Sequence, residues 1–222
     1  MTEVSWLGVR ERVAAIASSE ASQKVFGASG HRFVLRPVMS AAELVDVERV
    51  IGTPLPEEYR TFLLEVGNGG AGPGYGIERV ERTADGWRWT GHGVTTVAKL
   101  GVPFQPFDQQ VYAQHDAKQP VDSDFADHGS FMEASRAWMR RSDDLHDEET
   151  FGAITLSHQG CGYYWLLVVS GPERGAVWDD GRAGDMPLSP LTGPAGQRLT
   201  FDRWYLNWLT RTETAIVSAD GA

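Results

Sequence analysis

One stretch, residues 51–75 with the sequence IGTPLPEEYRTFLLEVGNGGAGPGY, constrains the fold most strongly. Pro56 suits the first position of a helix, because its φ is already fixed there and its missing N–H leaves no hydrogen bond unmade. Glu57 and Glu58 then place negative charge against the positive end of the helix dipole. The apolar residues that follow recur at helical spacing and predict one buried face: Tyr59, Phe62, Leu63 and Val66.

The same stretch predicts an abrupt end to this helix. Gly67 can adopt the left-handed conformation that ends many helices. The glycines up to Gly76 then allow a sharp turn into a strand, which we predict at residues 75–80. The sequence therefore predicts a helix that packs on a core and leads directly into a sheet.

The stretch combines a Leu-Pro-x-x-Tyr helix start, an apolar helix ending in Asn-Gly-Gly and a glycine-rich passage into a strand. In this combination it resembles the SUKH superfamily. This superfamily covers the Smi/Knr-type cell-wall assembly regulators of fungi and many bacterial immunity proteins. Two later segments, 175–178 and 201–208, are similar to its Gly-x-Val-Trp strand and its aromatic C-terminal helix. The residues that form the matching structural motif are Leu55, Pro56, Tyr59, Phe62, Leu63, Asn68, Gly69, Gly70 and Tyr75.

Three further helices are predicted from caps and apolar spacing. Residues 6–17 form the first, with Ser5 as its cap. Ser40 and Glu43 form a capping box before the second, which turns Leu44, Val47 and Ile51 inward. Another capping box, Ser130 with Glu133, begins a helix that we expect to end near Arg141.

The strands are predicted to pair through turns. Residues 84–86 read ADG and predict a hairpin that leads into the Trp87–Trp89 strand. Residues 151–179 contain three β-branched or aromatic runs, which predict an antiparallel meander with the middle run at its centre. Thr200 caps a last helix with an aromatic stripe. Helices gathered at both ends of the chain favour an α+β fold, and we expect a single, largely antiparallel sheet flanked by helices, as the SUKH resemblance also implies.

The resemblance divides the chain into three parts. We expect an N-terminal helix and extended arm at residues 1–39, a SUKH-like domain at 40–212 and a frayed C-terminal tail at 213–222. Residues 101–120 carry no periodicity that assigns them to a helix or strand.

Composition excludes several classes of function. The net charge of −10 and the absence of a basic stripe argue against nucleic-acid binding. No apolar run reaches the length of a membrane span, and no secretion signal is visible at the N-terminus. Cys161 is the only cysteine, which rules out an internal disulfide and is compatible with the cytoplasm.

No cofactor, metal site or catalytic set is predicted. Residues 67–72 match the letters of a dinucleotide fingerprint, but a helix precedes these glycines and a strand follows, the reverse of the arrangement that binds a pyrophosphate. The aspartates near His128 lack the glycine and the distant glutamate of a calcium loop. The six histidines lack the spacing of a zinc site, and no Gly-x-Ser-x-Gly elbow is present.

Two acidic runs and one tryptophan pair are the candidate partner-binding residues. Our main interpretation is that the two runs are a solvated loop and a linker. The functional alternative is that they form a surface that attracts a basic protein. Trp87 and Trp89 share one face of the predicted strand and are the best candidates for exposed aromatic rings, although such pairs are more often packed. The acidic candidates are Asp122, Asp124, Asp127, Asp143, Asp144, Asp147, Glu148 and Glu149.

The resemblance implies a non-enzymatic, cytoplasmic domain that binds another protein. For a bacterial member it implies an immunity protein that binds and blocks a toxin domain, such as a basic nuclease-type toxin. One alternative is a small-ligand or carbohydrate binder that uses the tryptophan pair and the glycine-rich turn. Another is a hydrolase that draws paired carboxylates from Glu57, Asp85 or the acidic runs.

Overall fold

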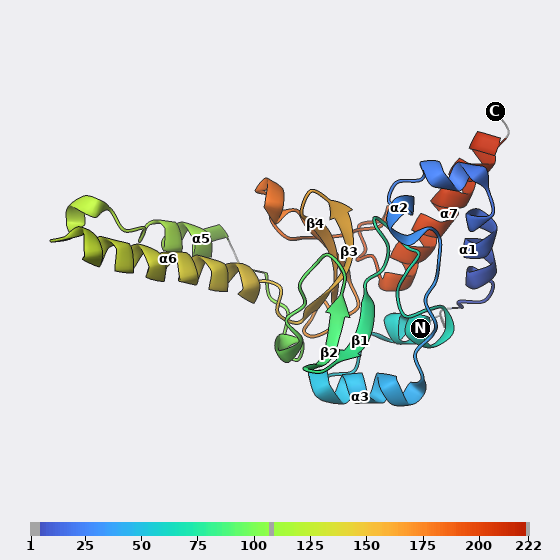
Figure 1. Cartoon of the computed structure of the whole chain (residues 1–222), viewed down its shortest axis with the longest axis horizontal. Coiled ribbons are helices and arrows are strands. Elements are labelled where there is room, and N and C mark those ends of the chain that lie inside the picture. The colour runs from blue at the N-terminus through green and yellow to red at the C-terminus, as the bar shows by residue number, and fades with distance from the viewer. Residues whose placement is uncertain (1–4, 107–108, 221–222) are drawn as a thin grey trace.

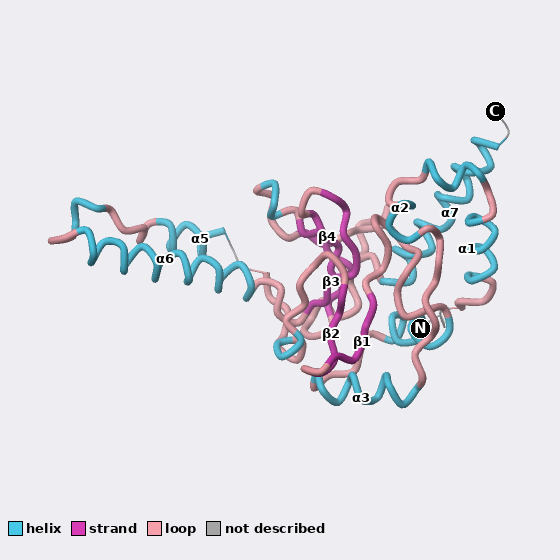
Figure 2. The backbone as a smooth tube through the Cα atoms, in the orientation of Figure 1, coloured by secondary structure: helices cyan, strands magenta, loops and turns pink. Residues whose placement is uncertain are grey.

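The structure, a computed structural model, describes residues 5–106 and 109–220. It consists of a rounded body from which two helices project together as an arm (Figure 1). The body contains the strands and most of the helices, whereas the arm consists of helices and loops alone (Figure 2). We define the arm as residues 109–149.

The helices and strands of the described residues have the following bounds. The α-helices are α1 (Val9–Ala17), α2 (Ala28–His31), α3 (Ala41–Ile51), α4 (Glu57–Glu65), α5 (Gln109–Asp116), α6 (His128–Glu148) and α7 (Phe201–Asp220). Short 3-10 helices are η1 (Glu20–Lys24), η2 (Val97–Lys99), η3 (Asp122–Asp124) and η4 (Arg182–Gly184). The strands are β1 (Arg79–Thr83), β2 (Gly86–Thr90), β3 (Ala153–Gly160), β4 (Tyr163–Val168), β5 (Val177–Asp180) and β6 (Ser189–Pro190).

The predicted α+β class and the antiparallel pairing are confirmed. Strands β3 to β6 form a four-stranded meander in sequence order, with β4 inside it as expected, and β1 pairs with β2 as a separate hairpin. The strands thus form two sheets where we expected one. Backbone hydrogen bonds from Tyr75 to His158 (2.9 Å) and from Glu78 to Leu156 (2.8 Å) join the segment before β1 to β3.

Helix α4 has the predicted buried face, and Tyr59, Phe62, Leu63 and Val66 are fully buried. Its two ends differ in detail from the prediction. Pro56 is the N-cap, one position before the first helical residue. Gly67 does not adopt a left-handed conformation, and the helix ends at Val66, which is still in the right-handed region.

The glycines of the glycine-rich turn with positive φ are Gly69 (82°), Gly70 (101°), Gly74 (61°) and Gly76 (101°). A Cβ on Gly70 would lie 2.3 Å from the carbonyl oxygen of Val34, so the turn needs glycine for close approach as well as for its φ. The side chain of Asn68 accepts from Val80 N (2.8 Å) and donates to Val80 O (2.6 Å). This clamp holds the turn against β1, which begins at Arg79, later than the predicted residue 75.

Helix α1 belongs to the same core as the rest of the body. It begins at Val9 after a left-handed Gly8, so the predicted cap at Ser5 is wrong. Trp6 nevertheless packs edge-on against Phe62 and Tyr205, at ring-centroid distances of 5.4 and 6.0 Å. The N-terminal segment therefore covers the junction between α4 and α7.

Helix α7 runs to Asp220, so the tail that we expected to fray from residue 213 is helical to that point. Arg12 on α1 forms an ion pair with Glu213 at 2.6 Å, and Ile216 is buried. Contacts with α1 thus extend the helix beyond its aromatic stripe. Residues 221–222 of the predicted tail lie outside the described residues.

Helix α6 departs furthest from its prediction. Asp127 is its N-cap and accepts a hydrogen bond from Ser130 N (2.9 Å), so the helix begins before the predicted Ser130 cap. It continues past Arg141 through Glu148, and the second acidic run is therefore helical rather than a linker. Helix α5 forms within the 101–120 passage that periodicity left unassigned.

Candidate partner-binding surface

The arm is built around one long helix. With 21 residues, α6 is about 31 Å long, and α5 lies alongside it (Figure 1). Trp138 stacks on His115 of α5 at 4.7 Å, with 6° between the ring planes, and its Nε1 donates to the carbonyl oxygen of His115 at 3.0 Å. Nearer the tip, Phe131 packs against Phe125 and His128. These contacts use one face of α6 and leave the opposite face exposed.

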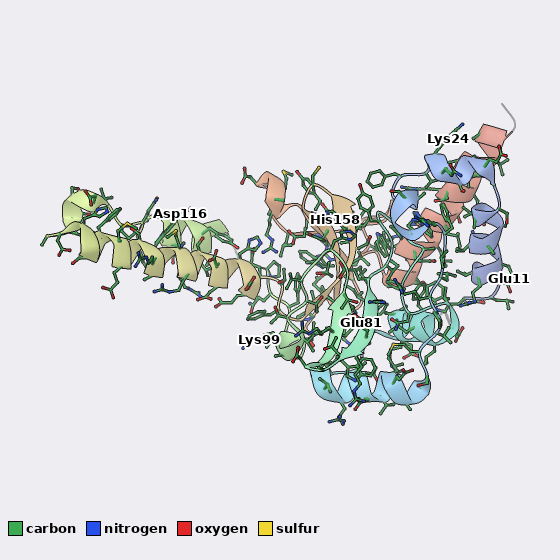
Figure 3. All side chains as sticks on the ribbon, in the orientation of Figure 1. Glu11, Lys24, Glu81, Lys99, Asp116 and His158 are labelled. Atoms are coloured by element: carbon green, nitrogen blue, oxygen red, sulfur yellow. The ribbon has the colours of Figure 1, made fainter. Side chains whose placement is uncertain are left out.

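The arm carries a large share of the protein's negative charge. It holds ten of the chain's 30 acidic side chains but only four of its 20 basic ones. The net charge of the arm is therefore about −6 of the total −10. The acidic residues are Asp116, Asp122, Asp124, Asp127, Glu133, Asp143, Asp144, Asp147, Glu148 and Glu149, and the basic ones are Lys118, Arg136, Arg140 and Arg141. Figure 3 shows Asp116 on the arm, well separated from the body that carries Glu11 and His158.

The structure places the two acidic runs at opposite ends of one helix, α6, which the sequence did not reveal. Asp122, Asp124 and Asp127 lie where α6 begins, and the second run lies on the last two turns of the same helix. Sixteen residues separate Asp127 from Asp143, which corresponds to about 24 Å along the axis. The surface thus has a tip group and a base group of carboxylates.

The carboxylates differ in what already binds them. Asp127 caps α6, and its hydrogen bonds from Ser130 lower its pKa. Glu148 pairs with Arg141 at 2.7 Å. Asp143, Asp144 and Asp147 are exposed, and within the described part of the chain none of the three has an ion-pair partner within 4.0 Å. These three carry the charge most available to a partner.

Glu149 must be removed from the set of exposed acids. It is only 4% exposed, and its carboxylate contacts the guanidinium of Arg182 (3.2 Å) and the hydroxyl of Tyr112 (2.6 Å). Burial is the main cause that raises the pKa of Tyr112, and the hydrogen bond to Glu149 raises it further. The phenol therefore stays protonated and donates. Glu149 therefore holds the arm on the body and does not face a partner.

Beside this contact lies a cleft between the base of the arm and the loop after β5. Its volume is about 370 Å³, and seven of the described residues line it: Tyr112, His146, Glu149, Arg182, Asp185, Met186 and Pro187. We call it the arm-base cleft. No sequence motif predicted Arg182 as a site residue. Only its contacts with residues far away in the sequence identify it as one.

Trp87 and Trp89, the best candidates for exposed aromatic rings, are packed instead. They are 7% and 5% exposed, and their Nε1 atoms donate to Asp46 (2.8 Å) and to the hydroxyl of Tyr59 (3.1 Å). Because helices α3 and α4 cover this face of the hairpin, neither ring can stack on a sugar. The pair belongs to the core.

The carboxylates considered for hydrolysis do not assemble at one place. Glu57 and Asp85 pair with Arg60 (2.9 Å) and Arg88 (3.0 Å) on separate parts of the body. Glu149 lines the arm-base cleft, but Arg182 and Tyr112 already bind its carboxylate. Among the described residues, no group of three or more His, Cys, Asp or Glu side chains could hold a metal ion.

One buried carboxylate, Glu78, was missed by the sequence reasoning because nothing in its local sequence marks it. Its Oε1 accepts hydrogen bonds from the backbone N–H groups of His92 (2.9 Å) and Gly93 (2.7 Å). Burial is the main cause that raises its pKa. Nearby, Tyr75 of the predicted motif stacks on His158 at 5.4 Å. These contacts hold the loop after β2 against β3, a structural role.

Comparison with known proteins gives one result. The family model described as the SMI1 / KNR4 family (SUKH-1) matches residues 39–185 of the sequence. This range contains the glycine-rich turn, the whole arm and strands β1 to β5. No match was found among curated proteins or among solved structures. In the described part of the chain, no helix is both long and apolar enough to span a membrane.

Proposed function

The chain belongs to the SMI1/KNR4 (SUKH-1) family, and from this we propose that it is an immunity-type protein that binds a toxin domain and blocks it without a reaction of its own. In this proposal it acts in the cytoplasm of the producing bacterium. The family supports binding to another protein. The acidic arm supports a partner with a basic surface, such as a nuclease-type toxin.

One observation carries the choice of surface: about −6 of the net −10 charge projects from the body on a single arm. Charge concentrated on a projecting element raises the rate of encounter with an oppositely charged partner. It also disfavours nucleic acid itself as a ligand, because phosphates would be repelled. An acidic helix that lies in the basic substrate groove of a toxin would keep the substrate out.

The experiment compares two charge-reversal variants that alter net charge equally. The arm variant carries Asp143→Lys, Asp144→Lys and Asp147→Lys. The control carries Glu11→Lys, Glu20→Lys and Glu65→Lys, which replace three exposed acids of the body. Each is co-expressed with the toxin encoded beside its gene, and survival of the cells is measured together with the dissociation constant of the purified complex.

We expect the wild type and the control to rescue growth and the arm variant to bind on the order of tenfold more weakly or worse. The difference should shrink at high salt, because exposed charges are screened. Equal binding by both variants would show that the arm is not the surface. Failure of the wild type to rescue growth or to bind would refute the immunity role.

A further inference from the structure

The arm-base cleft has an apolar wall and a polar floor. Tyr112 of the arm faces Met186 and Pro187 of the loop after β5, and Met186 is 61% exposed. A volume of about 370 Å³ lies at the lower end of the range of small-ligand pockets, about 300–1,000 Å³. The cleft therefore suits one long side chain better than a whole cofactor.

The charged groups on the floor of the cleft are already engaged in internal contacts. Arg182 donates to both oxygens of Asp180 (2.8 Å each), to the carbonyl oxygen of His146 (2.6 Å) and to Glu149 (3.2 Å). Its side chain is 12% exposed. A guanidinium engaged in this way offers little to an incoming anion.

Asp185 supplies a carboxylate at the cleft that no internal contact of the described residues engages. It is exposed at the rim of the cleft, and among the described residues its carboxylate has no hydrogen-bond or ion-pair partner. Its backbone adopts φ 60°, and its N–H donates to the carbonyl oxygen of Arg182 at 3.1 Å, which fixes its place next to the buried pair. Asp180, Glu149 and Asp185 together outweigh the single guanidinium, so the cleft favours a cation.

We propose that the arm-base cleft receives an arginine or lysine side chain of the partner protein. The aliphatic stem of that side chain lies against Tyr112 and Met186, and its charged head reaches Asp185. The exposed Asp143 and Asp147, on the turns of α6 that lead into the cleft, attract the same basic surface. Arginine is enriched among the residues that dominate binding energy at interfaces. The inference rests on the proposed function, because it identifies the group of the partner that the base of the arm recognises.

The first test needs no partner. Nα-acetyl-arginine amide and its neutral isostere Nα-acetyl-citrulline amide are titrated into the protein while the methyl signal of Met186 is followed by NMR. We expect saturable shifts with the arginine compound at millimolar concentration and much smaller shifts with citrulline. Asp185→Asn should weaken arginine binding roughly three- to fivefold, which is the contribution of one exposed ion pair.

Asp185→Asn is a mild change, because asparagine tolerates the left-handed backbone that this position requires. The control is Asp116→Asn, which removes one charge from the far end of α5 and should leave arginine binding unchanged. Equal shifts with citrulline, equal binding by Asp185→Asn, or a saturable response to inorganic phosphate in place of arginine would each overturn the inference.

The second test separates this inference from the proposed function. If the toxin complex is weakened by Asp143→Lys, Asp144→Lys and Asp147→Lys but not by Asp185→Asn, the proposed function stands and the cleft is not the anchor. If the arginine compound binds in the cleft while the wild type neither rescues growth nor binds the toxin, the cation site stands and the proposed function fails.

Discussion

Arg182 and Glu149 form an ion pair at 3.2 Å that fixes the base of α6 to the end of the four-stranded sheet. The side chains are only 12% and 6% exposed, and Asp180 at the end of β5 binds the other edge of the guanidinium. The arm is thus attached through buried, hydrogen-bonded charges. Such pairs contribute modest net stability, but they become costly when one partner is lost.

The first prediction follows from that asymmetry. Arg182→Gln leaves Glu149 and Asp180 buried without a countercharge and should lower the free energy of unfolding by about 3 to 5 kcal/mol. Hydrogen exchange should accelerate first in the last turns of α6. Arg88→Gln breaks the exposed pair with Asp85 and should cost at most about 1 kcal/mol. Similar losses in the two variants, measured by urea denaturation, would contradict this account of the attachment.

The second prediction concerns the glycine-rich turn. Gly70→Ala adds a Cβ that meets the carbonyl oxygen of Val34 and should lower stability by more than about 3 kcal/mol or prevent folding. Gly196→Ala is the matched control, since Gly196 also has a positive φ (77°) but nothing within 4 Å of the added Cβ. Backbone strain alone should cost the control about 1 to 2 kcal/mol. Thermal unfolding of both variants measures the difference.

The third prediction concerns the clamp between the turn and β1. Asn68→Ala removes both side-chain hydrogen bonds to Val80 and should cost about 2 kcal/mol, because the backbone groups of Val80 lose their partners. Asn207→Ala replaces an exposed asparagine of α7 and should be nearly neutral. If Asn68→Ala were as stable as this control, the clamp would not contribute to folding.

The fourth prediction is a dependence of stability on pH. His31 is 7% exposed, its Nδ1 accepts from Phe33 N at 3.0 Å, and burial lowers its pKa from 6.5 to about 4. Between these values the unfolded chain binds a proton that the folded protein does not. Stability should therefore fall as pH decreases from 6.5 towards about 4, with a total loss from this residue of at most about 3 kcal/mol.

The measurement compares the wild type with His31→Gln by urea denaturation from about pH 7 to about pH 4. Glutamine does not titrate, so the free energy of unfolding of the variant should depend less steeply on pH, even if the variant is less stable at neutral pH. Parallel pH profiles for the two proteins would contradict the assignment to His31. An NMR titration of the His31 ring gives its pKa directly.

Features set by neighbouring residues were predictable from the sequence. The Ser40–Glu43 capping box is present, with both hydrogen bonds made, because its partners lie three residues apart. The buried face of α4 and the three-strand meander followed equally from local spacing. The antiparallel class then followed because short turns join neighbouring strands.

Features set by distant contacts were not predictable. The acidic run at residues 143–149 looked like a linker, because negative charge near a helix C-terminus is unfavourable. The helix continues there because Leu145 is buried, Arg141 pairs with Glu148 and Arg182 binds Glu149. Likewise, the shared face of Trp87 and Trp89 was visible in the sequence, but its cover by Asp46 and Tyr59 was not.

The arm shares almost none of its packing with the body. The buried apolar side chains of the body form two core clusters, and among the described residues neither cluster includes a residue between Phe104 and Ala153. Replacing side chains on the exposed face of α6 therefore leaves the folding of the body unaffected. Under the proposed function, a lineage can change what the arm recognises, one substitution after another, while the scaffold beneath it keeps its sequence.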